Sequence, residues 1–155
     1  MFFPDPVQAF STLRAAANPG AELVFSCFQA WTENSWADEL TSAAAGRTVP
    51  RPGREPSGFA FAETDYVSDI LSSAGWTEVR WHPVPFRYVA ARGPEAVDDA
   101  LSFLGAIGPA SRVIGELPEW ERGDALQRMR GVIERHFNGE VVEFSAAAWI
   151  YSARR

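Results

Sequence analysis

The residue types that most often carry out chemistry in proteins are few in this chain and lie far apart. It contains two histidines, His82 and His136, and one cysteine, Cys27. A metal centre needs several such ligands or carboxylates at close spacing, so the sequence predicts none. His82 could act as a general base, but a histidine at a strand end is the simpler interpretation. We expect His136 to pack at a helix end and Cys27 to be a small buried side chain rather than a nucleophile.

Motifs for a nucleophile or for phosphate binding do not occur in the sequence. Hydrolases with a nucleophile elbow carry Gly-x-Ser-x-Gly, and phosphate-binding loops need closely spaced glycines before a helix. None of the 12 glycines forms such a pattern. Paired carboxylates occur at Asp98-Asp99 and at Glu119 with Glu121. They stand at expected helix starts, where acidic residues are favoured electrostatically, so we interpret them as solvated helix faces.

The strongest candidate site is the polar and aromatic segment 31–36, WTENSW. It follows a predicted strand at Ala21–Phe28, and open α/β sheets bind ligands beyond the carboxyl ends of their strands. Trp31 and Trp36 would wall an apolar or aromatic pocket, and Asn34 would orient its ligand. Two tryptophans that cover the core and an asparagine in a turn fit the same sequence equally well.

The elements that would position this segment alternate between helices and strands. Hydrophobic spacing and capping residues predict helices at 5–17, 35–46, 66–74, 94–107 and 124–137. They predict a central strand, buried on both faces, at 21–28, a bent edge strand at 77–88 and a strand at 140–153. The segment 47–58, with three prolines and two glycines, predicts an exposed loop. This order favours an α/β fold with a small mixed sheet.

Composition limits the kinds of molecule that the protein can bind and the cellular compartments in which it can act. The formal net charge of −6 leaves no broad cationic surface for nucleic acid. No apolar stretch approaches the roughly 20 residues of a membrane-spanning helix. With a single cysteine and no signal-peptide pattern, the sequence predicts a cytoplasmic protein. The 46% of hydrophobic residues suffice for a core.

Several blocks of the sequence together resemble one known family. They are Asp5-Pro6-x-x-Ala9-Phe10, Pro19-Gly20-Ala21-Glu22-Leu23, Asn34-Ser35-Trp36, the stretch FAFAETDYVSDILSSAGW and Ala146-Ala147-Ala148-Trp149-Ile150. In this order they resemble class I S-adenosylmethionine-dependent methyltransferases of the ubiquinone/menaquinone, small-molecule type. Ala21 stands where that family has a second glycine, and Ser35 stands where it has proline.

The resemblance implies the C-terminal half of a Rossmann-like methyltransferase fold. Residues 1–155 would form a single partial domain, from the end of the fourth strand to the seventh, with a helical cap at about 94–138. The family's glycine-rich loop for S-adenosylmethionine lies upstream of these blocks. We therefore expect no cofactor-binding residue here, and we expect that this chain alone binds no cofactor.

The same resemblance implies a set of residues that would bind a small-molecule methyl acceptor. The residues on the acceptor side of the cleft would be Phe2, Phe3, Trp31, Asn34 and Trp36. It assigns no catalytic residue, because methyl transfer in this family depends mainly on positioning the methyl group and excluding water. As an enzyme the chain is thus a methyltransferase by resemblance, and we expect it to be inactive alone.

The opening stretch MFFPDPVQAF is typical of the interior of a protein. By the resemblance, its apolar start would be the tail of a fourth strand. The chain would then be a gene fragment or a subunit of a split enzyme. An alternative is an inactive half-domain that binds an apolar ligand or forms oligomers. Its partner, a second copy or the missing N-terminal half, would pair along the uncovered edge of the strand Ala21–Phe28.

Overall fold

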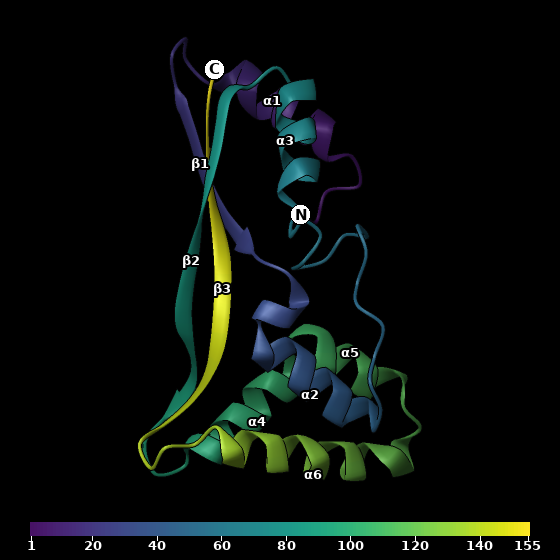
Figure 1. Cartoon of the computed structure of the whole chain (residues 1–155). Helices are drawn as coiled ribbons and strands as arrows, with labels where there is room; N and C mark the ends of the chain where they lie inside the picture. Colours follow the sequence, from purple (N-terminus) through teal and green to yellow (C-terminus); the bar gives the residue numbers. More distant parts are fainter. The chain divides into compact units, whose positions relative to one another are not determined.

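The computed structural model describes residues 1–155 and contains six α-helices, one 3₁₀-helix and three β-strands (Figure 1). In chain order these are α1 (Pro6–Ala16), β1 (Glu22–Phe28), η1 (Trp31–Glu33), α2 (Ser35–Ala45), α3 (Thr64–Ser73), β2 (Thr77–Arg92), α4 (Ala96–Ala106), α5 (Gly108–Glu116), α6 (Glu119–Arg135) and β3 (Val141–Arg154). The predicted mixture of helices and strands is confirmed. No helix has both the length and the apolar composition needed to cross a bilayer.

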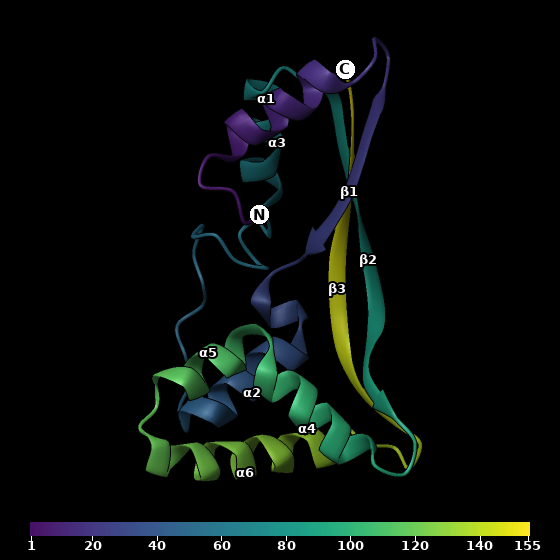
Figure 2. The same cartoon turned by 180° about the vertical axis from the view of Figure 1, so that it is seen from behind.

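The chain divides into two compact units, which we describe separately. Unit 1 comprises Met1–Trp31, Pro52–Pro85 and Ala147–Arg155, and unit 2 comprises Thr32–Arg51 and Phe86–Ala146. The strands β2 and β3 contribute residues to both units. Unit 1 contains β1, α1 and α3, whereas the helices of unit 2 are α2, α4, α5 and α6 (Figure 2).

The sheet has the order β1-β3-β2, so the C-terminal strand lies in the middle. β1 pairs with β3 in antiparallel fashion, from Glu22 opposite Arg154 to Phe28 opposite Ala148. Thr77, at the start of β2, donates a hydrogen bond through its hydroxyl to the carbonyl of Arg154, at the end of β3. β2 therefore also runs antiparallel to β3, and the sheet is antiparallel rather than mixed as predicted.

The prediction of β1 as a central strand buried on both faces is wrong. β1 is an edge strand, and its burial alternates: Glu22, Val24 and Ser26 are exposed, while Cys27 is buried. Its run of apolar residues is typical of a strand that is buried on both faces. In an antiparallel sheet, however, one face of the sheet is often exposed to solvent. Val24, which is 59% exposed, lies on that face.

The helices of unit 1 begin and end largely where their capping residues predicted. The Asp5 side chain caps α1 by accepting a hydrogen bond of 2.9 Å from the backbone N–H of Gln8. α3 ends at Ser73 with Ala74 as its C-cap, and the next residue, Gly75, has a φ of +86°, the left-handed conformation common after helix ends. The spacing of Phe10 and Leu13 predicts that both lie on the core face of α1, but Leu13 is 48% exposed. Phe10 is the buried residue of this short helix, so the apolar face is narrower than the spacing indicated.

Two helix starts in unit 2 differ from the predictions. The spacing of Ser35 and Asp38 predicts Ser35 as the N-cap of α2, but the N-cap is Asn34 and Ser35 is the first helical residue. α6 begins at Glu119 instead of Asp124, because Glu119 and Glu121 favour its first turn and Gly123 is tolerated inside it. Gly108, directly after the predicted helix at 94–107, has a φ of +78° where α4 gives way to α5.

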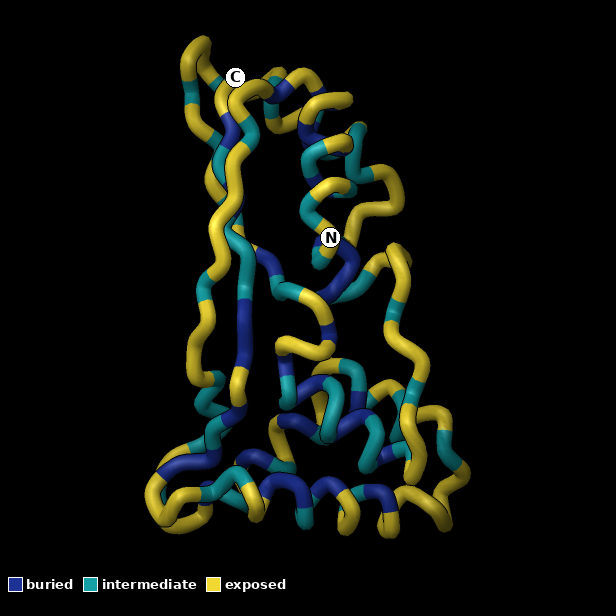
Figure 3. Tube along the Cα trace, in the orientation of Figure 1, coloured by how far each residue is buried: buried dark blue, intermediate teal, exposed yellow.

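Buried residues occur in both halves of β3 (Figure 3). They shift from even-numbered to odd-numbered positions along the strand, so β3 buries opposite faces in its two halves. In unit 2, Val142, Phe144 and Ala146 are buried, whereas in unit 1 the buried side chains include Tyr151 and Ala153. Strict alternation would continue the buried face of Val142, Phe144 and Ala146 through Ala148 and Ile150, but both of these are only half-buried. The reason is that the strand supplies side chains to the cores of two units.

Candidate functional site

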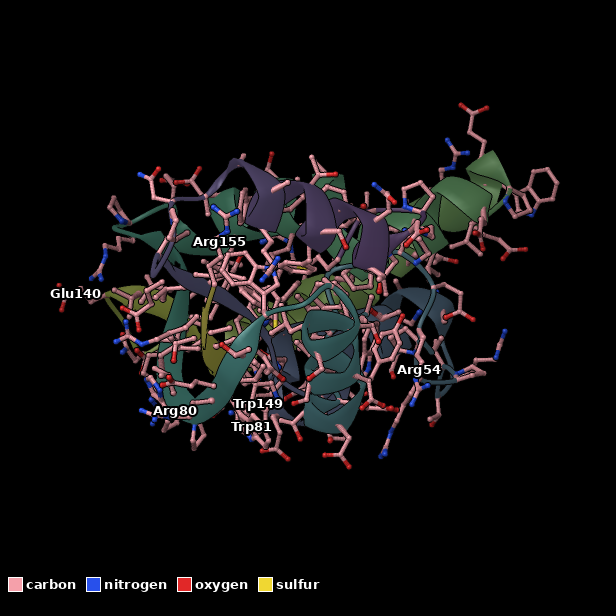
Figure 4. The ribbon with its side chains drawn as sticks, turned by 90° about the horizontal axis from the view of Figure 1, so that it is seen from above. Arg54, Arg80, Trp81, Glu140, Trp149 and Arg155 are labelled. Carbon is pink, nitrogen blue, oxygen red and sulfur yellow. The ribbon has the colours of Figure 1, made fainter.

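Unit 1 contains an open pocket of about 420 Å³. It is lined by residues from three places in the sequence, namely Arg54, Ala62, Glu63, Thr64, Asp65 and Trp149. Arg54 belongs to the loop that follows α2, the next four residues surround the start of α3, and Trp149 belongs to β3. Figure 4 shows the side chains of Arg54, beside α3, and of Trp149.

The start of α3 gives the pocket its polar edge. Glu63 is the N-cap residue of α3, but its side chain makes no capping hydrogen bond. Instead its carboxylate accepts hydrogen bonds from Nε of Arg54 at 3.2 Å and from Nη2 of Arg54 at 2.6 Å. The first N–H groups of a helix have no acceptor within the helix, so the start of α3 adds backbone donors beside these charged side chains.

Two side chains hold Arg54 in place: Glu63, the N-cap residue of α3, and Tyr66, in the first turn of α3. Besides the Glu63 carboxylate, the ring of Tyr66 lies under the guanidinium, with 4.4 Å between the guanidinium carbon and the ring centroid. The hydrogen bonds that Arg54 donates to the Glu63 carboxylate raise the pKa of Arg54, and the negative charge of Glu63 contributes further. Both partners of the ion pair are more than half exposed, so it orients the guanidinium more than it stabilises the fold.

Trp149 forms the aromatic wall of the pocket. Its indole Nε1 donates a hydrogen bond of 2.9 Å to the carbonyl of Ala62, which fixes the ring against the segment before α3. The indole is half-buried. The pocket thus combines an aromatic surface with one guanidinium, the carboxylates of Glu63 and Asp65, and the hydroxyl of Thr64. Such a lining can bind and orient a small molecule that has both a ring and polar groups.

The candidate nucleophile and bases of the sequence lie outside this pocket. Burial raises the pKa of the Cys27 thiol to about 12, and its Sγ donates to the carbonyl of Phe61 at 3.3 Å. Cys27 is therefore a buried thiol, as predicted. His82 is exposed on β2. No group of three or more His, Cys, Asp or Glu side chains is arranged to hold a metal ion.

His136 lies at the end of α6 in unit 2, where we predicted a packed histidine. Its Nε2 lies 3.0 Å from a carboxylate oxygen of Glu39. Its Nδ1 lies 3.2 Å from the carbonyl oxygen of Glu143, and its ring centroid lies 4.2 Å from that of Phe144. The contacts join α2, α6 and β3, so the role of this histidine is structural.

The five residues predicted to bind the acceptor lie in both units. In unit 1, Phe2 and Phe3 are 70% and 48% exposed, while Trp31 is buried with its ring centroid 5.1 Å from that of Phe59. In unit 2, Asn34 and Trp36 lie together at the start of α2 and are buried. None of the five lines the pocket of unit 1. Their role in acceptor binding stays a prediction.

Trp36 and Asn34 have well-defined places within unit 2. The Trp36 ring stacks on Tyr88 with 5.1 Å between centroids and 14° between planes. The backbone carbonyl of Asn34 accepts hydrogen bonds from the N–H groups of Ala37 at 2.9 Å and Asp38 at 3.2 Å. These contacts fix the first turn of α2 on the core of the unit.

The residues of the pocket were not singled out from the sequence, although signals for them existed. Alternation along the strand at 140–153 places Trp149 on the same face as Glu143 and Ser145, which are polar. A large indole at such a position indicates either a packing role or a ligand contact. Ala62 to Asp65 are part of the stretch FAFAETDY, and Trp149 is part of AAAWI. Both stretches belong to the blocks that carry the family resemblance.

Comparison with known proteins adds distant similarity to solved structures. No protein-family model matches the chain, and no curated protein matches it. Among solved structures, it is similar to the crystal structure of a putative methyltransferase from Bacillus halodurans C-125, with 14% sequence identity and a TM-score of 0.47. The similarity covers 99% of this chain and 59% of that chain. This chain thus spans less than two thirds of that protein, and at this TM-score the similarity assigns it neither a fold nor an activity.

Proposed function

We propose that this chain carries the acceptor-binding half of an S-adenosylmethionine-dependent methyltransferase that acts on a small molecule. The observation that carries the proposal is the composition of the pocket in unit 1. Five of its six lining residues come from the two sequence blocks FAFAETDY and AAAWI. Blocks that resemble the family and lie far apart in the sequence thus meet around one concave surface.

The lining fits what methyl transfer requires of the acceptor side. The reaction depends on holding the acceptor atom in line with the sulfonium methyl group and on keeping water away. Trp149 offers a flat apolar surface for a ring, and its hydrogen bond to Ala62 fixes that surface. Arg54 and Asp65, of opposite charge, can orient polar substituents of the acceptor.

In this proposal the cofactor is held by residues outside this sequence. The glycine-rich loop that binds S-adenosylmethionine in the family does not occur among these 155 residues. We expect the protein to act in the cytoplasm, since its single, buried cysteine requires no oxidising compartment.

Calorimetric titration tests the proposal directly. We expect the chain to bind members of a panel of small aromatic acceptors with hydroxyl or amino groups, and to give no heat with S-adenosylhomocysteine. The variant Trp149→Phe should weaken acceptor binding by about tenfold, through loss of the fixed indole surface. The matched control is Trp120→Phe, because Trp120 is 81% exposed on α6 in unit 2 and should not affect the pocket.

Three outcomes would contradict parts of the proposal. If no panel compound binds the wild-type chain, the pocket is not an acceptor site. If Trp149→Phe and Trp120→Phe bind equally well, acceptors bind elsewhere. Tight binding of S-adenosylhomocysteine by the chain alone would overturn the view that its cofactor is held from outside.

A further inference from the structure

The hydrogen-bonding pattern between β1 and β3 decides which backbone groups of β1 point away from the sheet. At one end of the pair the Arg155 N–H donates to the Ala21 carbonyl, and at the other the Gln29 N–H donates to the Ala147 carbonyl, each at 2.9 Å. Both pairs continue the antiparallel register of the strands. Because hydrogen-bonded pairs alternate along such a ladder, the odd-numbered residues of β1 bond to β3.

The even-numbered residues Glu22, Val24 and Ser26 therefore direct their N–H and C=O groups to the outer side of β1. β1 is the end strand in the order β1-β3-β2, so this outer side is an edge of the sheet. The same three residues are exposed, and Val24 alone is 59% exposed. The edge offers a row of backbone donors and acceptors beside an exposed apolar side chain, which is the template for adding another strand.

The two edges of the sheet differ in their protection against such pairing. The strand at the other edge, β2, carries Pro83 and Pro85 and the exposed side chains of Arg80 and Arg87. Prolines and cations are the usual means of preventing the addition of a strand. β1, with the sequence ELVFSCF, has no proline and one charged residue, Glu22, at its first position. The unprotected edge is therefore the one that presents Val24.

We propose that the edge of β1 pairs with the same edge of a second copy of this chain. Antiparallel pairing about a two-fold axis through Val24 places Val24 opposite Val24 of the second copy, and Glu22 opposite its Ser26. Each carboxylate then faces a hydroxyl that can donate a hydrogen bond, and no like charges stand opposite each other. All outward N–H and C=O groups of the three residues find partners in this register.

Sedimentation over a range of concentrations tests the pairing with variants at the symmetry axis. We expect the wild type to form dimers reversibly. Val24→Lys and Val24→Glu should each weaken dimerisation by about tenfold, because each places like charges opposite one another. An equimolar mixture of these two variants should dimerise again, since Lys and Glu then stand opposite each other at the axis.

The matched controls are Leu13→Lys and Leu13→Glu. Leu13 is an exposed apolar residue of the same unit, on α1 rather than on the strand edge. These variants lose a similar apolar surface and gain the same charges, so they should dimerise as the wild type does. Thermal unfolding followed by circular dichroism should show that all four variants are folded.

Amide hydrogen exchange supplies a second readout. Exchange at Val24 and Ser26 should slow as the protein concentration rises, whereas exchange at Leu23 and Phe25, already bonded to β3, should not change. A wild type that stays monomeric at every concentration would overturn the proposal, as would dimers that Val24→Lys and Leu13→Lys weaken equally. Val24 does not line the pocket, so acceptor binding by the Val24 variants tests the proposed function independently.

Discussion

Phe25 and Tyr151 stand directly opposite each other on β1 and β3, and their rings stack with 5.1 Å between centroids and 12° between planes. Phe25 also lies 5.3 Å from Phe10 of α1, measured between ring centroids. The pair therefore joins the sheet to a helix within unit 1. Cross-strand aromatic pairs of this kind stabilise a sheet beyond the apolar area they bury.

The buried hydroxyl of Tyr151 destabilises this core. The side chain is fully buried, and its hydroxyl has no hydrogen-bond partner. Tyr151→Phe keeps the stacked ring and removes the unsatisfied group, so it should raise the free energy of unfolding by about 1 kcal/mol. Urea denaturation measures this change. The control Tyr66→Phe, on a ring that is only half-buried, should leave stability nearly unchanged. A clear loss of stability in Tyr151→Phe would mean that the hydroxyl is bonded in solution.

Gly75 should not tolerate a side chain. Its φ is +86°, and a Cβ built there would lie 3.1 Å from Nε of Arg14. Gly75→Ala should lower the free energy of unfolding by about 1 to 2 kcal/mol, because of the left-handed backbone and the crowding. Gly131→Ala in α6 is the control, since no atom lies within 4 Å of a Cβ at that position and helices favour alanine. It should be stabilising, and equal effects of the two substitutions would contradict the interpretation.

Arg128 connects α6 to the end of α2. Its Nε and Nη2 donate to the carbonyls of Ala43 and Ala44, in the last turn of α2, at 2.7 and 2.8 Å. The Ala43 carbonyl also accepts a hydrogen bond of 3.1 Å from the backbone N–H of Gly46. Arg128→Ala should cost about 1 kcal/mol of unfolding free energy, a value reduced by the exposure of the side chain. Arg128→Lys should restore little, because an ammonium group lacks the two-pronged geometry.

Thermal unfolding checks the role of Arg128 against Arg112→Ala, on the exposed surface of α5. Arg112→Ala removes the same charge without touching α2, so it should unfold at the wild-type temperature. If Arg128→Lys proved as stable as the wild type, charge at the helix end rather than the paired hydrogen bonds would explain the contact.

The stability of unit 1 should depend on alkaline pH through Cys27. Burial raises the pKa of its thiol from the ordinary 9.0 to about 12, so between these values the folded state holds a proton that the unfolded state has lost. This contribution is fully present below about pH 9 and declines as the pH rises toward 12. The urea midpoint of the wild type should therefore fall from pH 8 to pH 10.5, and that of Cys27→Ala should fall less.

The same pKa predicts that Cys27 is unreactive in the folded protein. At pH 8 about one thiol in ten thousand is ionised when its pKa is about 12. Iodoacetamide should label it slowly in the native state and rapidly in urea. Fast labelling of the native protein would show that the thiol is open to solvent, contrary to its 5% exposure.

Local sequence signals were sufficient for most helices and for the loop at 47–58. Asp5 before Pro6 marked the start of α1, and Gly75 marked the end of α3, because caps act through contacts within a few residues. The boundaries failed where several signals competed. Asn34 rather than Ser35 precedes α2, and α6 starts at Glu119 despite Gly123.

The candidate site depended on contacts that no local pattern encodes. The sequence singled out Trp31, Asn34 and Trp36 because they follow a strand, yet the structure buries all three. The pocket instead joins a loop, the start of α3 and β3, through the contacts of Arg54 with Glu63 and of Trp149 with Ala62. Residues so far apart in the chain are brought together only by packing.

The sequence by itself determined the element types, the helix caps, the buried nature of Cys27 and the absence of a phosphate-binding glycine motif. All of these depend on composition or on neighbours within a few residues. Only the tertiary structure decided that β3 lies in the middle of an antiparallel sheet and that β1 is an edge strand. It also decided that β3 contributes buried side chains to the cores of both units. Strand order and the choice of buried face follow from long-range pairing, where the apolar run of β1 fits a central or an edge position equally well.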